Sequence, residues 1–324
     1  MKNNRKQDSA VKYPLSAILG SRGHLVVLRE LFRSGNPVSH SELLERTDLS
    51  RQGVYDVTKR LTETGVAAYS GSGRQQLIGL RKDFPLYDSL NQLFSSELKV
   101  YENFLETLKQ IIGGLGKKPE SVWIFGDAAL GYDEYGDPIQ LAVLGKLKEI
   151  DDITREFREK IMVEKVEHYF DVTIDVRGVT IADLEARPFL TEGAVIRLWG
   201  LDPDNYLNPQ TNGFAAVHGH QDFDERSLAE SEVWSELLKS NPEIIPRTIR
   251  YLESRIREIS NGEKSELLEW KHLLRNCSPQ RLKKFLTSDS ERATRLRQSL
   301  PFWPVLTEHE QKKFKIMIGE LLNI

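Results

Sequence analysis

The segment from residue 39 to residue 80 most restricts what this chain can fold into. Ser50 precedes a run whose apolar residues recur at intervals of three and four, namely Val54, Val57 and Leu61. This spacing predicts an amphipathic helix with the Ser50 side chain as its N-cap. Ser39 stands in the same way before a shorter helical pattern over residues 40–46. Because only three residues, 47–49, separate the two patterns, they predict a helix-turn-helix.

A β-hairpin is predicted directly after these two helices. Gly65 can end the second helix as a left-handed residue. Beyond it, the β-prone runs 66–69 and 75–80 flank a glycine-rich tip at residues 70–74. A hairpin in this position is a wing.

Residues 15–94 therefore resemble the winged helix-turn-helix domains of bacterial and archaeal transcription regulators, of the MarR-like and ArsR-like type. The resemblance is carried by Leu19–Arg22, Ser41–Leu44, Leu49–Ser50, Val54, Leu61 and Glu63–Val66. It implies double-stranded DNA as the partner, although winged helices are also used as protein-interaction modules. Charge agrees with DNA, since residues 1–95 hold 14 Lys and Arg against 9 Asp and Glu. Their net charge of +5 within a total of −3 leaves −8 for residues 96–324.

Seven residues are expected to contact DNA. Side chains opposite the apolar stripe of the second helix point to solvent, where Gln52 suits adenine and Lys59 suits guanine or phosphate. The start of that helix can meet a phosphate. The wing tip can enter a minor groove or touch the DNA backbone through Arg74. The full set is Ser50, Arg51, Gln52, Tyr55, Asp56, Lys59 and Arg74.

Two further helices are expected around this pair. One spans residues 22–32, with a core stripe of Leu25, Val26, Leu28 and Leu31. The other is a long helix with one apolar face over residues 86–111. It either forms a homodimer, as trailing helices of winged-helix regulators often do, or connects to the next domain. The glycines and the proline of Gly113–Pro119 end it.

From Val122 onward the pattern becomes mixed α/β. Strands are expected at residues 122–125, 139–144 and 169–176, and helices at 153–163 and 180–186. This order resembles the nucleotidyltransferase superfamily that includes DNA polymerase β. Its members place Phe-Gly-Ser after the first strand, Ala-Arg-Gly nearby and Ser-Asp-x-Asp-Leu on the second strand, where two aspartates and a third carboxylate bind Mg²⁺ at the nucleotide.

The chain departs from this pattern at the residues that carry the chemistry. Phe125-Gly126 matches, but Asp127 replaces the serine, Leu130 replaces the arginine, and Pro138 and Gln140 replace the two aspartates. Neither can neutralise Mg²⁺. The resemblance thus implies a degenerate site formed by Gly126, Asp127, Asp137, Pro138, Gln140, Asp171 and Asp175. No catalytic residue, metal or cofactor is expected, unless Asp133 or Asp137 is recruited together with Asp171 or Asp175. Such a pocket could hold a nucleotide without metal or serve as a scaffold.

Residues 199–224 are expected to form a loop. His218 and His220 within it could share a metal, but a plain surface loop is the favoured interpretation. Helices are expected at 228–238, 244–259, 267–274, 279–286, 290–300 and 308–322, with Ser290 and Thr307 as N-caps. Arg292, Arg295 and Arg297 could line a basic ridge or simply face solvent. This helical domain could replace a substrate-binding bundle or bind a partner protein.

The predicted fold class is therefore α+β and multidomain. The expected parts are a winged helix (1–95), a connecting helix and linker (96–118), a nucleotidyltransferase-like domain (119–207), a loop (208–225) and a helical domain (226–324). The single cysteine, Cys277, excludes an internal disulfide, and the absence of an 18-residue apolar run or signal peptide predicts a cytoplasmic protein.

The favoured function is a sequence-specific transcription regulator of the repressor type. Its degenerate domain would serve dimerisation, ligand sensing or partner binding. The alternatives are an active nucleotidyltransferase that recruits its substrate through the winged helix, and an autoregulating antitoxin or defence-system component.

Overall fold

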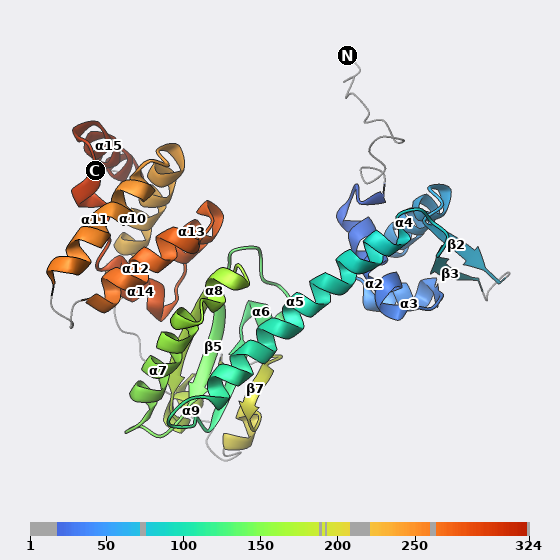
Figure 1. The fold of residues 1–324 in the computed structure, drawn as a ribbon, viewed down its shortest axis with the longest axis horizontal. Helices are drawn as coiled ribbons and strands as arrows, with labels where there is room; N and C mark the ends of the chain where they lie inside the picture. Colours follow the sequence, from blue (N-terminus) through green and yellow to red (C-terminus); the bar gives the residue numbers. More distant parts are fainter. Residues whose placement is uncertain are drawn as a thin grey trace. The chain divides into compact units, whose positions relative to one another are not determined.

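The computed structural model describes residues 18–71, 76–187, 190–191, 193–207, 221–259 and 264–322, of which 221–229 and 320–322 are described by their backbone alone (Figure 1). The chain is mixed α/β with two small sheets. It divides into two compact units, residues 1–103 and 104–324. In the ranges described, no helix is long and apolar enough to cross a membrane.

Among the described residues of unit 1 are a short three-stranded sheet and three helices that lie wholly within the unit. Its elements are α2 (Arg22–Ser34), β1 (Val38–Ser39), α3 (His40–Arg46), α4 (Arg51–Glu63), β2 (Ala67–Ser70), β3 (Leu77–Leu80) and the first part of α5 (Tyr87–Gly113). The strands are antiparallel in the order β1-β3-β2. The predicted helix pair and the hairpin that follows it are thus confirmed.

The local signals that predicted these helices act as expected. The Ser50 hydroxyl accepts a hydrogen bond from the Gly53 amide at 3.1 Å. Ser39 forms a reciprocal capping box with Glu42. Gly65 follows α4 with a φ of +74°. In α2 Leu28 and Leu31 are buried as predicted, but the fully buried valine is Val27 and not the predicted Val26.

The sheet of unit 2 has four strands, covered on both faces. Its strands are β4 (Ser121–Phe125), β5 (Ile139–Leu144), β6 (Ile174–Val179) and β7 (Ile196–Gly200). The short helices between and after them are α6 (Asp127–Leu130), α7 (Ile150–Val163), α8 (Val166–Tyr169), α9 (Ile181–Ala186) and the 3₁₀ turn η3 (Pro203–Tyr206). The strand order is β6-β5-β4-β7, with β5 and β6 parallel and the other pairs antiparallel.

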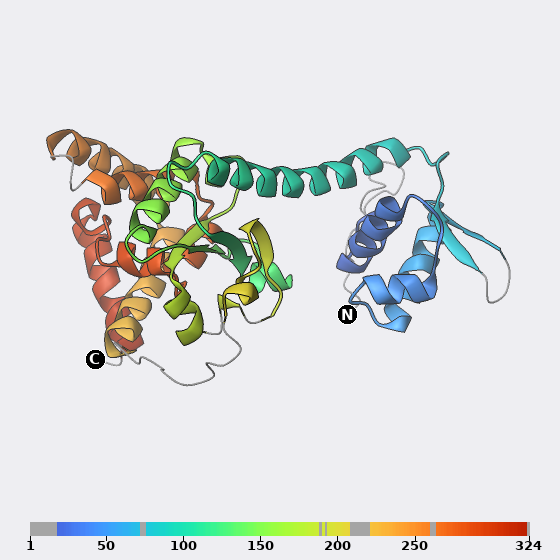
Figure 2. The same ribbon diagram turned by 90° about the horizontal axis from the view of Figure 1, so that it is seen from below.

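The alternation of side chains along the strands divides the core of this part into two layers. Leu141 and Val143 face α5 and α7, whereas Ala142 and Leu144 face α9 and the segment around Leu190. Figure 2 shows α5 and α9 on opposite sides of the sheet. Residues 104–113 of α5 thus belong to the core of unit 2, as residues such as Leu90 belong to that of unit 1.

Two predictions for the sheet are wrong. The third strand begins at Ile174 and not at Tyr169, because the left-handed residues Lys165 and Asp171 enclose the helical turn α8. Part of the predicted loop is strand β7, which ends at Gly200 and pairs with β4. That pairing joins residues more than 70 positions apart in the sequence, so no local sequence pattern indicates it.

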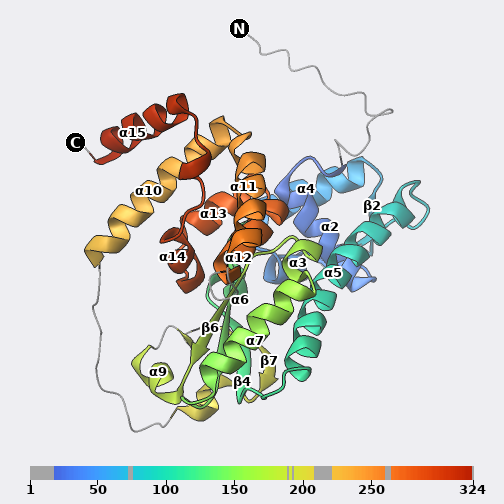
Figure 3. The ribbon, with the colours of Figure 1, turned by 60° about the vertical axis from the view of Figure 1, so that its left-hand side comes forward.

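The last part of unit 2 is all helical. Its elements are α10 (Gln221–Ser240), α11 (Ile244–Glu258), α12 (Lys264–Asn276), α13 (Pro279–Leu286), α14 (Glu291–Arg297), the 3₁₀ turn η4 (Trp303–Val305) and α15 (Glu308–Leu322). An aromatic cluster fills its core, formed by Trp234, Trp270, Phe285, Phe302 and Phe314. The predicted caps Ser290 and Thr307 are confirmed. These helices pack against the sheet, with α14 next to β6 (Figure 3).

Candidate functional site

The outer face of α4 is polar and exposed along its whole length. Val54, Val57 and Leu61 are buried beneath it, whereas Tyr55 is 53% exposed. Each of the predicted contact residues on this helix is exposed, namely Arg51, Gln52, Tyr55, Asp56 and Lys59. Arg74 lies outside the described residues.

Two of these side chains are held by neighbours one turn away. The Gln52 amide donates to Asp56 Oδ1 at 2.7 Å, and the Lys59 ammonium lies 4.0 Å from Glu63. The Gln52 amide keeps its oxygen and one N–H for another partner. Ser50 accepts from Gly53 but still has its own proton to donate. The face therefore presents donors at the helix N-terminus and, in the same first turn, an oriented amide.

Three side chains that the sequence did not single out fix the position of α4. His40 Nε2 lies 3.1 Å from Thr58 Oγ1, and the Tyr69 hydroxyl donates to the same oxygen at 3.1 Å. The His40 and Tyr69 rings stack with centroids 5.7 Å apart. The cluster joins α3, α4 and β2, so that the exposed face rests on a rigid support. Thr58 is on the apolar stripe, but its partners are 18 and 11 residues away.

A second candidate site lies where β4 ends and where β5 and β6 begin. In the register of the sheet Gln140 is opposite Phe125 on one side and Asp175 on the other. Gly126 follows β4 with φ +71° and ψ −155°, a conformation that is essentially restricted to glycine. Gln140 lies directly over it, because a Cβ on Gly126 would be only 2.7 Å from Gln140 Oε1. The strands thus bring Gly126, Gln140 and Asp175 together at one end of the sheet, where β4 ends and where β5 and β6 begin.

The carboxylates in the loops at this end of the sheet are bound to cations of α13. Asp137 lies 3.0 Å from the Lys284 ammonium, and Asp171 lies 2.5 Å from the guanidinium of Arg281. Tyr135 also donates to Asp171 at 2.7 Å. Burial alone would raise the pKa of Asp171, but the hydrogen bond from Tyr135 and the charge of Arg281 lower it below its usual value. Arg281 itself is buried and donates to the Val172 carbonyl.

Asp175, the candidate for the third carboxylate, is engaged differently. It is 3% exposed and accepts the backbone N–H of Arg292, at the start of α14, at 3.3 Å. Burial raises the pKa of Asp175, although the charge of Arg177 works against this rise. Its carboxylate therefore serves the contact between β6 and α14.

These residues do not fit a magnesium site. Asp137, Asp171 and Asp175 each face a different basic residue or amide, and Asp127 is exposed at the start of α6. Pro138 offers no side-chain ligand. In the part of the chain that the structure describes, no group of three or more His, Cys, Asp or Glu is placed to hold a metal ion. His218 and His220 lie outside the described residues.

The two alternatives expected for the arginines of α14, a basic ridge and a solvent-facing set, are both wrong for Arg292 and Arg297, which are buried or nearly so. The side chain of Arg292 is 10% exposed and pairs with Glu167 at 2.5 Å and with Glu269 at 2.6 Å. Arg295 pairs with Glu269 at 2.6 Å. Arg297 is buried and donates to backbone carbonyls before α14. The reason is tertiary, because Glu167 comes from α8, 125 residues earlier in the chain.

Glu167 is the centre of this buried network. Its side chain is 4% exposed, accepts the Ile174 amide at 2.8 Å and lies 3.5 Å from His272. Burial would raise the pKa of Glu167, but the charge of Arg292 and the hydrogen bonds lower it to about 2. The charges of Glu167 and Glu269 in turn raise the pKa of Arg292, against the effect of its burial. The network therefore joins the sheet to the helical part.

Compared with known proteins, the chain matches no family model, no curated protein and no solved structure at a significant level. Its function has to be inferred from the arrangement of its own residues.

Proposed function

We propose that the chain is a sequence-specific DNA-binding transcription regulator, most simply a repressor. In this proposal unit 1 is a winged helix whose α4 lies in the major groove of duplex DNA. Unit 2 combines a catalytically inactive nucleotidyltransferase-like domain with a helical domain and serves dimerisation, ligand sensing or partner binding. The exposed residues 95–103 of α5 are proposed to pair with a second copy of the chain.

One observation carries the proposal, namely the exposed polar face of α4 above a fully packed core. A recognition helix uses exposed polar side chains and its N-terminal residues in this way to contact base edges and phosphates. The α3–α4 pair holds this face rigidly through the His40, Thr58 and Tyr69 cluster. The net charge of +5 in residues 1–95 favours a polyanionic partner.

The test is a double variant of the α4 face, Gln52→Ala with Lys59→Ala. We expect loss of specific binding to the best-bound genomic fragment in gel shifts, because each base contact contributes about 1–3 kcal/mol. A matched control changes the same residue types outside α4 and α5, Gln298→Ala with Lys148→Ala, both exposed in unit 2. Unchanged affinity in a folded α4 variant would refute the proposed recognition helix.

The proposed loss of catalysis rests on the cations that occupy the candidate carboxylates. Lys284 and Arg281 bind Asp137 and Asp171, and Asp175 accepts the backbone N–H of Arg292. We expect no Mg²⁺-dependent transfer from a radiolabelled nucleoside triphosphate. Incorporation of label that disappears in Asp137→Asn or Asp175→Asn would instead establish an active nucleotidyltransferase.

A further inference from the structure

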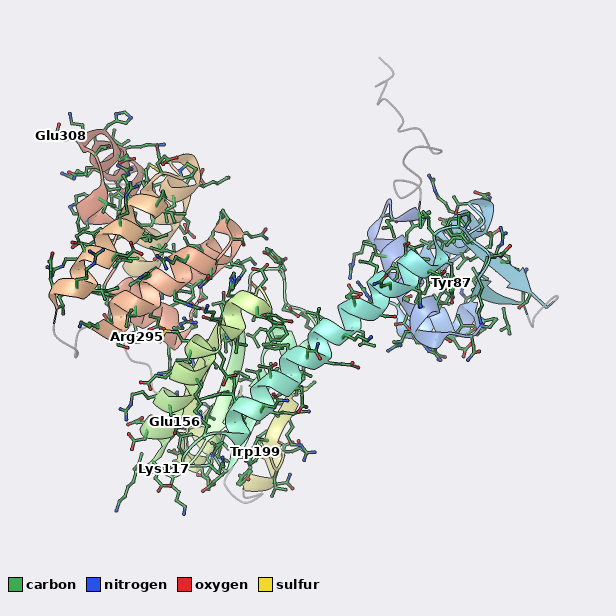
Figure 4. The ribbon with its side chains drawn as sticks, viewed as in Figure 1. Tyr87, Lys117, Glu156, Trp199, Arg295 and Glu308 are labelled. Atoms are coloured by element: carbon green, nitrogen blue, oxygen red, sulfur yellow. The ribbon has the colours of Figure 1, made fainter. Side chains whose placement is uncertain are left out.

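A cavity of about 180 Å³ lies within unit 2, between the sheet and the helical part. The edge strand β6 forms its floor, and α7 and the α12–α14 pair form its walls. Four arginines line it, namely Arg155, Arg158, Arg292 and Arg295. Figure 4 labels Arg295 where the helical part meets α7. The cavity is separate from the end of the sheet that carries Gly126 and Gln140, neither of which lines it.

Two of the arginines are held in place by the backbone of the edge strand. Arg158 Nε donates to the Val176 carbonyl at 3.1 Å, and its Nη2 donates to the same oxygen. Arg292 Nη1 donates to the Ile174 carbonyl at 2.9 Å. These bonds satisfy carbonyls that an unpaired strand would leave open. They also fix both guanidinium groups before any ligand arrives.

Among the arginines that line the cavity, Arg158 is the one for which no direct carboxylate partner is found in the described residues. The two buried carboxylates, Glu167 and Glu269, are neutralised by Arg292 and Arg295, and Glu159 is exposed. Among the described residues Arg158 forms no ion pair, and its hydrogen bonds go to a neutral carbonyl. Desolvation by burial lowers the pKa of Arg158, an effect that the charge of Asp175 opposes and the charge of Arg295 reinforces.

We propose that this cavity binds the oxyanion group, phosphate or carboxylate, of a small molecule between Arg158 and Arg295. The Arg158 guanidinium is half-buried and its hydrogen bonds go to a neutral carbonyl, so an anion placed there would give it a charged partner in direct contact. Arg155 stands at the same wall as a further donor, although it also pairs with Asp152. The volume equals about six water molecules at ~30 Å³ each, which accommodates one such group and a small remainder of the ligand.

The site concerns unit 2 alone and does not depend on whether the winged helix binds DNA. Because its walls come from the sheet and from the helical part, a bound anion would connect the two through Arg158 and Arg295. Anion binding can therefore be disproved without affecting the proposal of DNA binding, and DNA binding can be disproved without affecting the anion site.

The experiment is isothermal titration calorimetry of the full chain with sodium phosphate and, separately, with sodium citrate, at an ionic strength held constant with chloride. We expect saturable binding of at least one of the two anions. Binding should weaken about tenfold or more in Arg158→Met and in Arg295→Gln, since a charged hydrogen bond contributes about 1.5–3 kcal/mol. Arg250→Gln, an exposed arginine of α11 outside the cavity, is the matched control and should bind as the unmodified chain does.

Saturation with phosphate alone would assign a phosphate-bearing ligand, and saturation with citrate alone a carboxylate-bearing one. No saturable heat with either anion would overturn the proposal, as would equal affinity in both cavity variants. Should Arg158→Met fail to fold, Arg295→Gln decides alone, because this side chain is 39% exposed and its Gln can still donate to Glu269.

Discussion

Glu167→Gln is the substitution that most directly probes the network between the sheet and the helical part of unit 2. The neutral amide keeps the size of the side chain but removes the charge that faces Arg292 and His272. Arg292 keeps Glu269 as a partner. The variant therefore weakens one buried ion pair without emptying the site.

The expected loss follows from the pKa of Glu167, which falls from its usual 4.5 to about 2 in the folded chain. A difference of about 2.5 units at 1.36 kcal/mol each corresponds to about 3 kcal/mol of stability. Breaking a buried ion pair by removing one partner typically costs about 3–5 kcal/mol, which agrees.

The sign of the pH dependence follows from the lowered pKa. The stabilisation by Glu167 is complete above about pH 4.5 and is lost as the pH falls toward about 2. Asp175 acts in the opposite direction, because burial raises its pKa. Comparing Glu167→Gln with the unmodified chain isolates the contribution of Glu167, since Asp175 is present in both.

Tryptophan fluorescence during urea unfolding is a selective assay, because all five tryptophans lie in residues 104–324. The exposed Glu258 of α11, which pairs with Arg255, supplies the control Glu258→Gln. We expect that control to cost less than about 1 kcal/mol. A loss below about 1 kcal/mol for Glu167→Gln at pH 7, equal to the control, would refute the reasoning about the buried network.

Further predictions concern one helix cap and two glycines with positive φ. Ser50→Ala should destabilise α4 by about 1 kcal/mol through loss of its N-cap; faster hydrogen exchange of the α4 amides would show this, and unaltered exchange would contradict it. Gly126→Ala should cost about 3 kcal/mol, because its backbone conformation excludes other residues and Gln140 must move. Gly131→Ala, also at positive φ but with open space around it, should cost only about 1–2 kcal/mol. Equal losses in fluorescence-monitored unfolding of the two glycine variants would show that the contact with Gln140 is unimportant.

The sequence predicted those parts of the fold that depend on neighbours in the chain. Ser39 and Ser50 cap helices because their hydroxyls reach amides three residues on, and Gly65 adopts the conformation that ends α4. Strand β5 begins and ends at the residues predicted for it, Ile139 and Leu144. The exposed residues of α4 followed from the periodicity of its apolar residues. In each case the physical cause lies within a few residues.

Features that depend on distant partners were missed. Strand β7 pairs with the side of β4 that β5 leaves open. Arg292 is buried because it pairs with Glu167 of α8. The resemblance to nucleotidyltransferases singled out Asp137 and Asp171 in the degenerate site, but not that Lys284 and Arg281 of α13 bind them. A local sequence pattern does not distinguish an arginine that faces solvent from one that pairs with a buried carboxylate.

The most direct test of the central claim is a selection of genomic DNA fragments with the purified full chain, followed by a gel-shift salt titration on the best fragment. The account predicts a discrete site bound at nanomolar concentration, with two half-sites whose spacing reports a dimer. Weak binding that is blind to sequence and collapses steeply with salt would contradict it, because such binding needs only a positive surface and no recognition helix.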